Sequence, residues 1–303
     1  FGKVVFEGCH FKDFVPVLLE PSYNAYTGFE LVFKDCIFDV TPTRNFIVSA
    51  GYLNDQKNNR PELSKKCWPN VSINNMVVNV PDNVSRVILF NVRGSVSKNY
   101  SVGHISKVKI DGMRFNYSGS GHSANLWLCN SDVSLSKPFS CTIHDLDILP
   151  VPNSQIVQAK TKYHYPSSVT FNLHHGTAKD VVKISNSRLN YNVNANAAYN
   201  IHFTKCTLGM VRYTSSVNGA KRIYKDCDIF LNCCDDRRYY LDNRATYENC
   251  LFIPCSPNMY VDFYGTYNDI VMNNCRSSRK KTLFFHGHLN NSDLKHFTLT
   301  TRR

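Results

Sequence analysis

The stretch Arg222–Phe230 reads Arg-Ile-Tyr-Lys-Asp-Cys-Asp-Ile-Phe, and its pattern recurs along the chain. A large aromatic or apolar residue is followed by two polar residues, a central Cys, one polar residue and another large apolar residue. Nine more stretches fit this pattern, with central residues Cys9, Cys36, Met76, Met113, Leu146, Ser187, Cys206, Cys250 and Cys275. A pattern that returns along most of a chain predicts a repeat architecture.

Two columns of the repeat are apolar in nearly every copy. Three positions before the centre stand Phe6, Phe33, Ile73, Ile110, Ile143, Ile184, Phe203, Tyr224, Tyr247 and Met272. Two positions after it stand Phe11, Phe38, Val78, Phe115, Ile148, Leu189, Leu208, Ile229, Phe252 and Ser277. This is the period-two alternation of β-strands, shifted by one step at the centre. The residue before the centre is Asp, Asn or Gly in nine copies, which predicts a left-handed turn residue there.

The spacing of the centres distinguishes between the repeat folds. The last four spacings are 19, 21, 23 and 25 residues, which is too short for the four strands of a propeller blade. No long 3.6-residue periodicity appears, so a helical repeat is disfavoured. One coil of a parallel β-helix fits this length. The longer spacings lie between Cys36 and Ser187 and predict loop insertions in the N-terminal half, such as residues 54–70, 116–123 and 150–168.

The pattern resembles the coil of right-handed parallel β-helix proteins, a superfamily that includes pectate lyases, polygalacturonases and bacteriophage tailspike depolymerases. The resemblance covers nearly the whole chain and implies an all-β fold, a single-stranded right-handed parallel β-helix that forms one domain over residues 1–303. The calcium-binding Asp cluster of pectate lyases has no clear match, so no metal and no cofactor are expected. Because Phe1 already stands in a strand-like pattern, we expect a fragment or a processed chain that lacks an N-terminal anchoring part.

The charge of the chain limits its partners. The formal net charge is +12, which is typical either of a basic soluble surface or of a protein with a polyanionic partner. The Lys and Arg residues are spread along the chain rather than clustered, which argues against nucleic acid. No apolar run approaches the roughly 18 residues of a transmembrane helix, so no membrane span is expected.

The twelve cysteines predict buried thiols rather than a metal site. There is no Cys-x-x-Cys pair, which disfavours a zinc ribbon or a redox motif. Six of the twelve stand at the repeat centre, where Met76, Met113 and Leu146 are accepted as well. Free Cys behaves as a small buried apolar residue. The sequence therefore predicts a column of reduced interior thiols, which suits folding in a reducing cytoplasm.

The outward positions beside the centre are rich in ionisable residues. Glycoside hydrolysis usually needs two carboxyl groups, and neighbouring coils at roughly 4.8 Å per step supply suitable separations. The candidate catalytic pairs are Asp111 with Asp147 and Asp228 with Glu248, and His144 is the candidate base if the enzyme is a lyase. The candidate substrate-binding cations and polar groups on the same face are Lys109, Arg114, Lys183, Arg188 and His202. The same residues also fit a solvated face whose opposite charges pair between coils.

Two other segments contribute candidate substrate-binding residues. The insertion over residues 150–168 carries Tyr163 and His164, and a later cluster carries Asp235, Asp236 and Tyr239. Carboxylates beside aromatic rings suit sugar binding. Both segments are equally typical of exposed loops and turns.

The resemblance to phage tailspikes implies a function. Members of that family are usually homotrimers with an N-terminal virion-anchoring part, and their β-helix binds a host surface polysaccharide and often cleaves it. We therefore expect a receptor-binding depolymerase for an acidic bacterial polysaccharide, a hydrolase in preference to a lyase. It would be made in the bacterial cytoplasm and located in the virion tail, in contact with other tail or virion proteins. The alternatives are a non-catalytic tail or adhesin segment that binds glycan or acts as a spacer, and a secreted pectin-type lyase or hydrolase.

Overall fold

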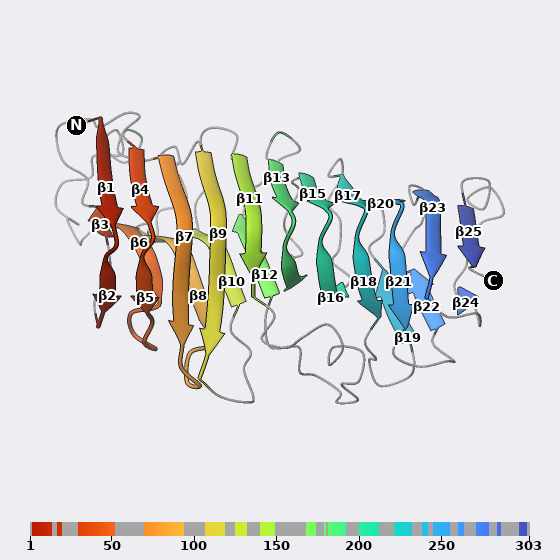
Figure 1. The fold of residues 1–303 in the computed structure, drawn as a ribbon, viewed down its shortest axis with the longest axis horizontal. Helices are drawn as coiled ribbons and strands as arrows, with labels where there is room; N and C mark the ends of the chain where they lie inside the picture. The colour runs from red at the N-terminus through yellow and green to blue at the C-terminus, as the bar shows by residue number, and fades with distance from the viewer. Residues whose placement is uncertain are drawn as a thin grey trace.

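The chain folds as a parallel β-solenoid (Figure 1). The computed structural model describes residues 2–13, 17–19, 30–51, 70–93, 107–118, 125–131, 140–148, 168–173, 179, 181–191, 200–211, 221–231, 238–241, 245–254, 260–263, 271–278, 284–285 and 297–301. These residues form strands and turns, with no helix among them and so no apolar helix long enough to cross a membrane. Most of the strands belong to one 22-stranded sheet.

The front of the solenoid is a row of strands that all run in the same direction (Figure 1). Strands before the centre of a repeat are β1 (Lys3–Glu7), β4 (Glu30–Lys34), β13 (Val181–Ser185), β15 (Asn200–Thr204), β17 (Arg222–Lys225) and β20 (Ala245–Glu248). Strands after the centre are β2 (His10–Lys12), β5 (Ile37–Asp39), β14 (Arg188–Tyr191), β16 (Thr207–Val211), β18 (Asp228–Leu231) and β21 (Leu251–Pro254). In β7 (Asn70–Val80), β9 (Lys107–Tyr117), β11 (Ser140–Asp147) and β23 (Val271–Ser277) one strand continues through the centre, and β25 (Phe297–Thr301) ends the row.

Further strands complete the coils. Behind the front row lie β3 (Val17–Leu19), β6 (Phe46–Gly51), β8 (Arg86–Arg93), β10 (Asn125–Ser131) and β12 (Ser168–Leu173) (Figure 1). A separate three-stranded parallel sheet contains β19 (Arg238–Leu241), β22 (Tyr260–Phe263) and β24 (Phe284–Phe285). Most of the predicted insertions lie outside the described residues.

The strand register confirms that the ten copies of the repeat are ten consecutive coils. Phe6 pairs with Phe33, Phe33 with Ile73, and the column continues without a gap to Tyr247 and Met272. An eleventh coil follows, because Met272 pairs with Phe297 and Cys275 with Leu299. Only one residue separates Phe297 from Leu299, so this coil lacks the two-residue turn of the repeat.

Each of the ten copies bends at the residue before its centre. Positive φ angles occur there at all nine predicted positions: Gly8, Asp35, Asn75, Gly112, Asp145, Asn186, Asp226, Asn249 and Asn274. Lys205 occupies the tenth, with φ 53°. At Gly112 a Cβ would also lie 3.3 Å from the backbone of Asn75, a close contact that favours glycine in addition to its φ of 82°.

The interior is filled by columns of like residues. The apolar columns predicted three before and two after the centre are buried in nearly every coil. Aromatic rings stack from coil to coil, with ring centroids 5.2 Å apart between Phe203 and Tyr224 and 4.7 Å apart between Tyr224 and Tyr247. Arg222 lies five positions before its repeat centre and is charged, yet it is buried between Ile201 and Ala245, its register partners.

The cysteines at the repeat centres donate hydrogen bonds as well as fill apolar space. The cysteines whose side chains the structure describes are free thiols, and all of them except the half-buried Cys9 are buried. Cys250 Sγ lies 3.5 Å from the Glu248 carbonyl and 3.4 Å from the Tyr224 carbonyl. Ser187 fills the same position and donates to the Ser185 carbonyl at 2.7 Å. A small donor at the centre therefore satisfies carbonyls beside the bend.

Candidate functional site

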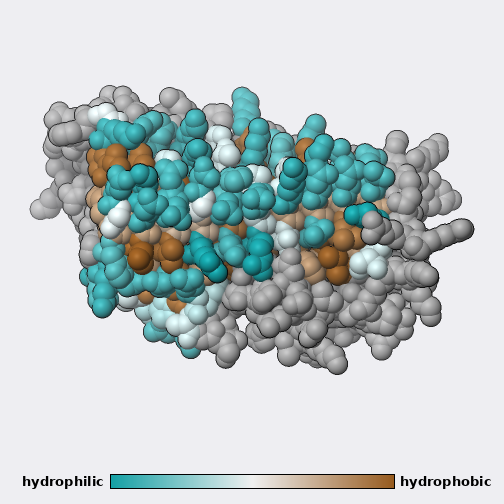
Figure 2. All heavy atoms as spheres, viewed as in Figure 1, coloured by the Kyte–Doolittle hydropathy of each residue, from teal (hydrophilic) through white to brown (hydrophobic). Residues whose placement is uncertain are grey.

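Three outward columns of the front strands carry the predicted site residues. The Lys183 column contains Lys109, Thr142, Lys183 and His202. The Asp111 column contains Asp111, His144, Ser185, Thr204, Lys225 and Glu248. The Asp147 column contains Arg114, Asp147, Arg188, Thr207, Asp228 and Leu251. Figure 2 shows that hydrophilic residues dominate this front face, with hydrophobic residues exposed near its β1 end, where Val5 is 48% exposed.

Asp147 stands between two arginines on three consecutive coils. It pairs in register with Arg114 on one side and Arg188 on the other. The Arg188 guanidinium donates from Nη1 to Asp147 Oδ2 at 3.3 Å. The other carboxylate oxygen, Oδ1, is buried and accepts no hydrogen bond from the described residues. Arg114 is exposed and forms no ion pair with a described residue, so this column carries an excess of positive charge around one carboxylate.

Asp111 has an imidazole and an ammonium group as neighbours. His144 Nδ1 lies 3.1 Å from Asp111 Oδ1, on the adjacent coil. Lys109 Nζ lies 3.7 Å from Oδ2 of the same carboxylate. Asp111 therefore does not face Asp147, because their register partners are His144 and Arg114. This predicted pair lies diagonally across the bend, and both of its carboxylates already have cationic or imidazole partners.

Lys183 is an exposed cation on this face, and the half-buried His202 stands beside it. They pair in register on β13 and β15. Partial burial of the imidazole, together with the charge of Lys183, lowers the pKa of His202. Lys183 is exposed and forms no ion pair with any described residue, and its other register neighbour is Thr142. An anion bound at this point meets a cation that is not already neutralised.

Asp228 and Glu248 have contrasting surroundings. Desolvation raises the pKa of Asp228, and the charge of Arg276, two coils further along the column, opposes that rise. Glu248 Oε1 accepts a hydrogen bond from Lys225 Nζ at 3.0 Å. The two carboxylates lie on adjacent coils, on opposite sides of the bend, with Leu251 and Lys225 as their register partners. One carboxyl group is therefore easier to protonate, while the other stands beside an ammonium group.

The remaining predicted residues belong to two other segments. Tyr163, His164, Asp235 and Asp236 lie outside the described residues. Tyr239 lies on β19 in the separate three-stranded sheet, where it pairs with Val261. Within the described part of the chain, no group of three or more His, Cys, Asp or Glu side chains is arranged to hold a metal ion.

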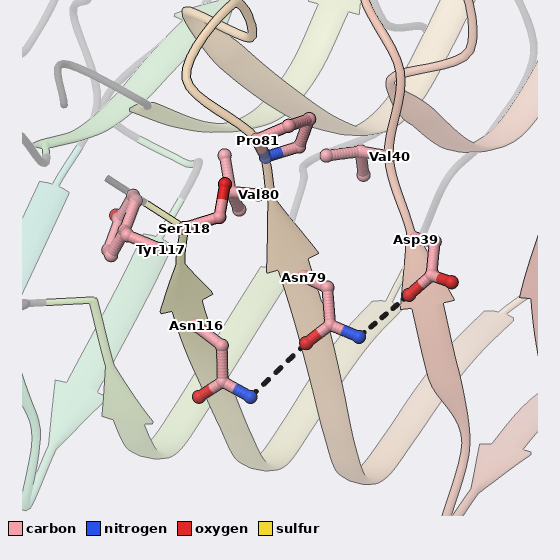
Figure 3. A pocket seen from close by; sticks show the side chains of 8 residues that line it. All are labelled: Asp39, Val40, Asn79, Val80, Pro81, Asn116, Tyr117 and Ser118. Atoms are coloured by element: carbon pink, nitrogen blue, oxygen red, sulfur yellow. Dashed lines mark hydrogen bonds between the residues drawn. The ribbon is translucent and has the colours of Figure 1, made fainter.

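The sequence reasoning missed a second polar row, which lies three positions after the centre. Asp39, Asn79 and Asn116 are in register on β5, β7 and β9. Asn79 donates to Asp39 at 2.7 Å, and Asn116 donates to Asn79 at 3.2 Å (Figure 3). His10 Nε2 lies 2.7 Å from the other oxygen of Asp39. Comparing the positions three after each centre would have revealed this row, because Asp, Asn and Asn occupy it in successive copies.

Comparisons with known proteins found no relative of this chain. No family model, no curated protein and no solved structure matches the chain.

Proposed function

We propose that this protein is a tailspike-like receptor-binding protein that binds an acidic bacterial surface polysaccharide along its front columns and cleaves it by hydrolysis. The observation that carries the proposal is the pairing of Lys183 with His202 beside the Arg114–Asp147–Arg188 line. Among these residues, Arg114 on one coil and Lys183 with Arg188 two coils further along are cationic, and a carboxylated polymer is a suitable partner for them.

The proposal includes a finer description of the fold, a right-handed, single-stranded parallel β-helix of the pectate-lyase type. Two points support the handedness. In Figure 1 the front strands run downward, the coils advance from left to right, and β6, β8 and β10 lie behind, which is a right-handed path. Parallel crossover connections are also right-handed in about 98% of cases.

The shape of the face suits a polymer rather than a small molecule. The three columns run across the strands, along the long axis of the solenoid (Figure 1). Each coil advances by roughly 4.8 Å, so an extended glycan lying along the axis meets one residue of each column per coil. Binding would then be the sum of several weak contacts, each sensitive to salt because the groups are exposed.

For cleavage, we favour Asp228 and Glu248, because the surroundings of the two carboxyl groups differ. Hydrolysis of a glycosidic bond needs one protonated carboxyl group as general acid and one ionised carboxylate as base or nucleophile. Two carboxyl groups whose surroundings push their pKa values apart are typical of such a division of labour. Asp228, whose pKa is raised, is the proposed acid, and Glu248, which accepts a hydrogen bond from Lys225, is the proposed second carboxyl group.

A specific observation favours a second candidate, a non-catalytic glycan-binding segment. Asp111, Asp147 and Glu248 each lie within 3.3 Å of a cationic or imidazole group. Carboxylates paired in this way suit a solvated face as well as an active site. The alternative of a secreted pectin-type enzyme is less favoured, because the cysteines with described side chains are free thiols.

The test is to incubate the protein with a panel of acidic capsular polysaccharides and to measure chain length, reducing ends and ultraviolet absorbance. We expect new reducing ends without an unsaturated product, which identifies a hydrolase. Absorbance from an unsaturated sugar would identify a lyase. Binding without any shortening would favour the non-catalytic candidate, and the absence of both binding and cleavage would reject the proposal.

The tailspike proposal also predicts assembly and location. We propose that the chain forms a homotrimer in the virion tail, in contact with other tail proteins. Light scattering coupled to size-exclusion chromatography measures the first property directly. A monomer at all concentrations would contradict the trimer, although glycan binding by a single solenoid would still stand.

A further inference from the structure

The polar row of Asp39, Asn79 and Asn116 lines a hollow, two residues beyond the position of Arg114 on β9. It has a volume of about 350 Å³ and is lined by Asp39, Val40, Asn79, Val80, Pro81, Asn116, Tyr117 and Ser118. Figure 3 shows the side chains of Asp39, Asn79 and Asn116 in a row on one side, with Val40, Pro81 and Tyr117 on the other. The volume lies in the range of small-ligand sites, which is about 300–1,000 Å³.

The polar side of the hollow is oriented by its own hydrogen bonds. Asn116 donates to Asn79 and Asn79 donates to Asp39, so every amide in the row has a defined direction. At the open end, Asn116 turns its Oδ1 away from the row (Figure 3). Because an amide presents both donors and an acceptor, this end offers the two kinds of group that a sugar hydroxyl uses.

The other side of the hollow is apolar and fixed. Val40 and Val80 are buried, and Pro81 is half-buried. Tyr117 donates from its hydroxyl to the Ile148 carbonyl at 3.1 Å, which holds its ring in place. A ring with a fixed orientation beside directed amides is a suitable surface for the C–H face of a saccharide.

The charge of the hollow distinguishes it from the front columns. Among the lining side chains that the structure describes, Asp39 is the one charged residue. Although partial burial opposes it, hydrogen bonds from Asn79 and His10 lower the pKa of Asp39, so this carboxylate stays ionised. A hollow with a carboxylate, and with no cation among its described lining residues, disfavours an acidic sugar.

We infer that the hollow is a binding site for an uncharged saccharide unit, next to the cationic face but different from it in chemistry. The polar row binds the hydroxyl groups, and Tyr117 and Pro81 contact the apolar face of the ring. This site does not depend on the proposed cleavage of an acidic polymer. It adds a second glycan contact, chemically different from the first, on coils two to four of the solenoid.

The experiment is ligand-observed saturation-transfer NMR on the full chain, with maltose, cellobiose and lactose as probes at millimolar concentration. Asn116→Leu removes the open amide, and Ser118→Tyr fills the hollow at an exposed position. Asn74→Ala is the matched control, because Asn74 lies on the same strand as Asn79 but outside the hollow. Circular dichroism melting establishes that each variant is folded.

We expect saturation transfer from at least one of the three probes in the unaltered protein and in Asn74→Ala. Asn116→Leu should weaken this binding by about tenfold, the typical effect of one or two lost hydrogen bonds, and Ser118→Tyr should abolish it. The inference is overturned if no probe shows saturation transfer. It is also overturned if Asn116→Leu and Ser118→Tyr both show the same transfer as the unaltered protein. Depolymerisation of an acidic polysaccharide by Asn116→Leu is measured in parallel, so that failure of the hollow and failure of the front face are distinguishable.

Discussion

Asp147 and Arg188 are 41 residues apart in the sequence, yet they lie in register on neighbouring coils with Arg188 Nη1 3.3 Å from Asp147 Oδ2. On the other side of Asp147, Arg114 is equally in register but forms no ion pair with a described residue. Two arginines of the same column therefore have different roles. Arg188 is a structural partner of Asp147, and Arg114 remains available for a ligand.

The first prediction separates these two roles. Arg188→Met should lower the free energy of unfolding by about 1 kcal/mol, the upper end of the range for partly exposed ion pairs. Arg114→Met should leave the unfolding free energy within about 0.5 kcal/mol of the original value. Urea denaturation measures both. Equal destabilisation by the two substitutions would contradict the assignment.

The second prediction concerns the thiol column. Because Ser187 already makes the same carbonyl contact as Cys250, Cys250→Ser should retain the donor and cost less stability than Cys250→Ala. Removing a donor and leaving a small void costs about 1–2 kcal/mol. Denaturation curves of the two variants give the comparison. If alanine is tolerated better than serine, the column acts only as apolar filling.

The third prediction concerns thiol accessibility. Burial raises the pKa of the Cys141 thiol, and the reactive form of cysteine is the thiolate. We expect iodoacetamide to modify the half-buried Cys9 well before Cys141 in the folded protein. Peptide mass spectrometry after timed quenching measures this order. Rapid labelling of Cys141 under native conditions would contradict its place in the core.

The fourth prediction concerns Lys205, the one long side chain at a bend with positive φ. Asn tolerates this conformation better than Lys, so Lys205→Asn should stabilise the protein by about 0.5 kcal/mol. Lys205→Val should destabilise it by about 1–2 kcal/mol, because a β-branched residue is strained there. The control is Lys221→Asn, at an exposed position with no positive φ. An equal gain from both Asn substitutions would mean that charge, not backbone strain, causes the effect.

The fifth prediction concerns acid stability at Asp39. Its pKa is lowered in the folded protein, so the carboxylate contributes stability that is present above its ordinary pKa of about 4 and is lost as the pH falls through the lower folded value. Asp39→Asn should therefore be less stable than the original protein at neutral pH, and the gap should close on acidification. Unfolding free energies of the two proteins, measured from neutral pH to below the ordinary pKa of aspartate, test how their difference changes with pH. A gap that widens in acid would contradict it.

The sequence predicted the coil well because its signals are local. Nine of the ten bends carry Asp, Asn or Gly, and the apolar columns alternate with a fixed offset from the centre. The bend at Lys205 was not predicted, because lysine is not a typical turn residue. The eleventh coil was not predicted, because Phe297 and Leu299 are too close in the sequence to fit the repeat. Its register with β23 shifts by one residue between Met272 and Cys275.

The site was predicted less completely. Side-chain contacts between coils depend on the register across the bend as well as on the column that a residue occupies. The pairing of Asp111 with His144 rather than with Asp147 follows from the bend, which offsets positions on its two sides. The Asp39 row lies beyond the positions compared from coil to coil. Arg222 shows the opposite case, a charged residue that the fold buries at an inward position.

The central claim is that the cationic face binds an acidic polysaccharide, and the most direct measurement is the affinity of Lys183→Met for an acidic capsular polysaccharide that the unaltered protein binds. The matched control is Lys107→Met, which removes an exposed lysine from the same front row of strands. We expect binding by Lys183→Met to be about tenfold weaker, with the control unchanged and both sensitive to salt. Affinity that is the same in Lys183→Met as in the unaltered protein, or the absence of binding to every acidic polysaccharide tested, would contradict the account.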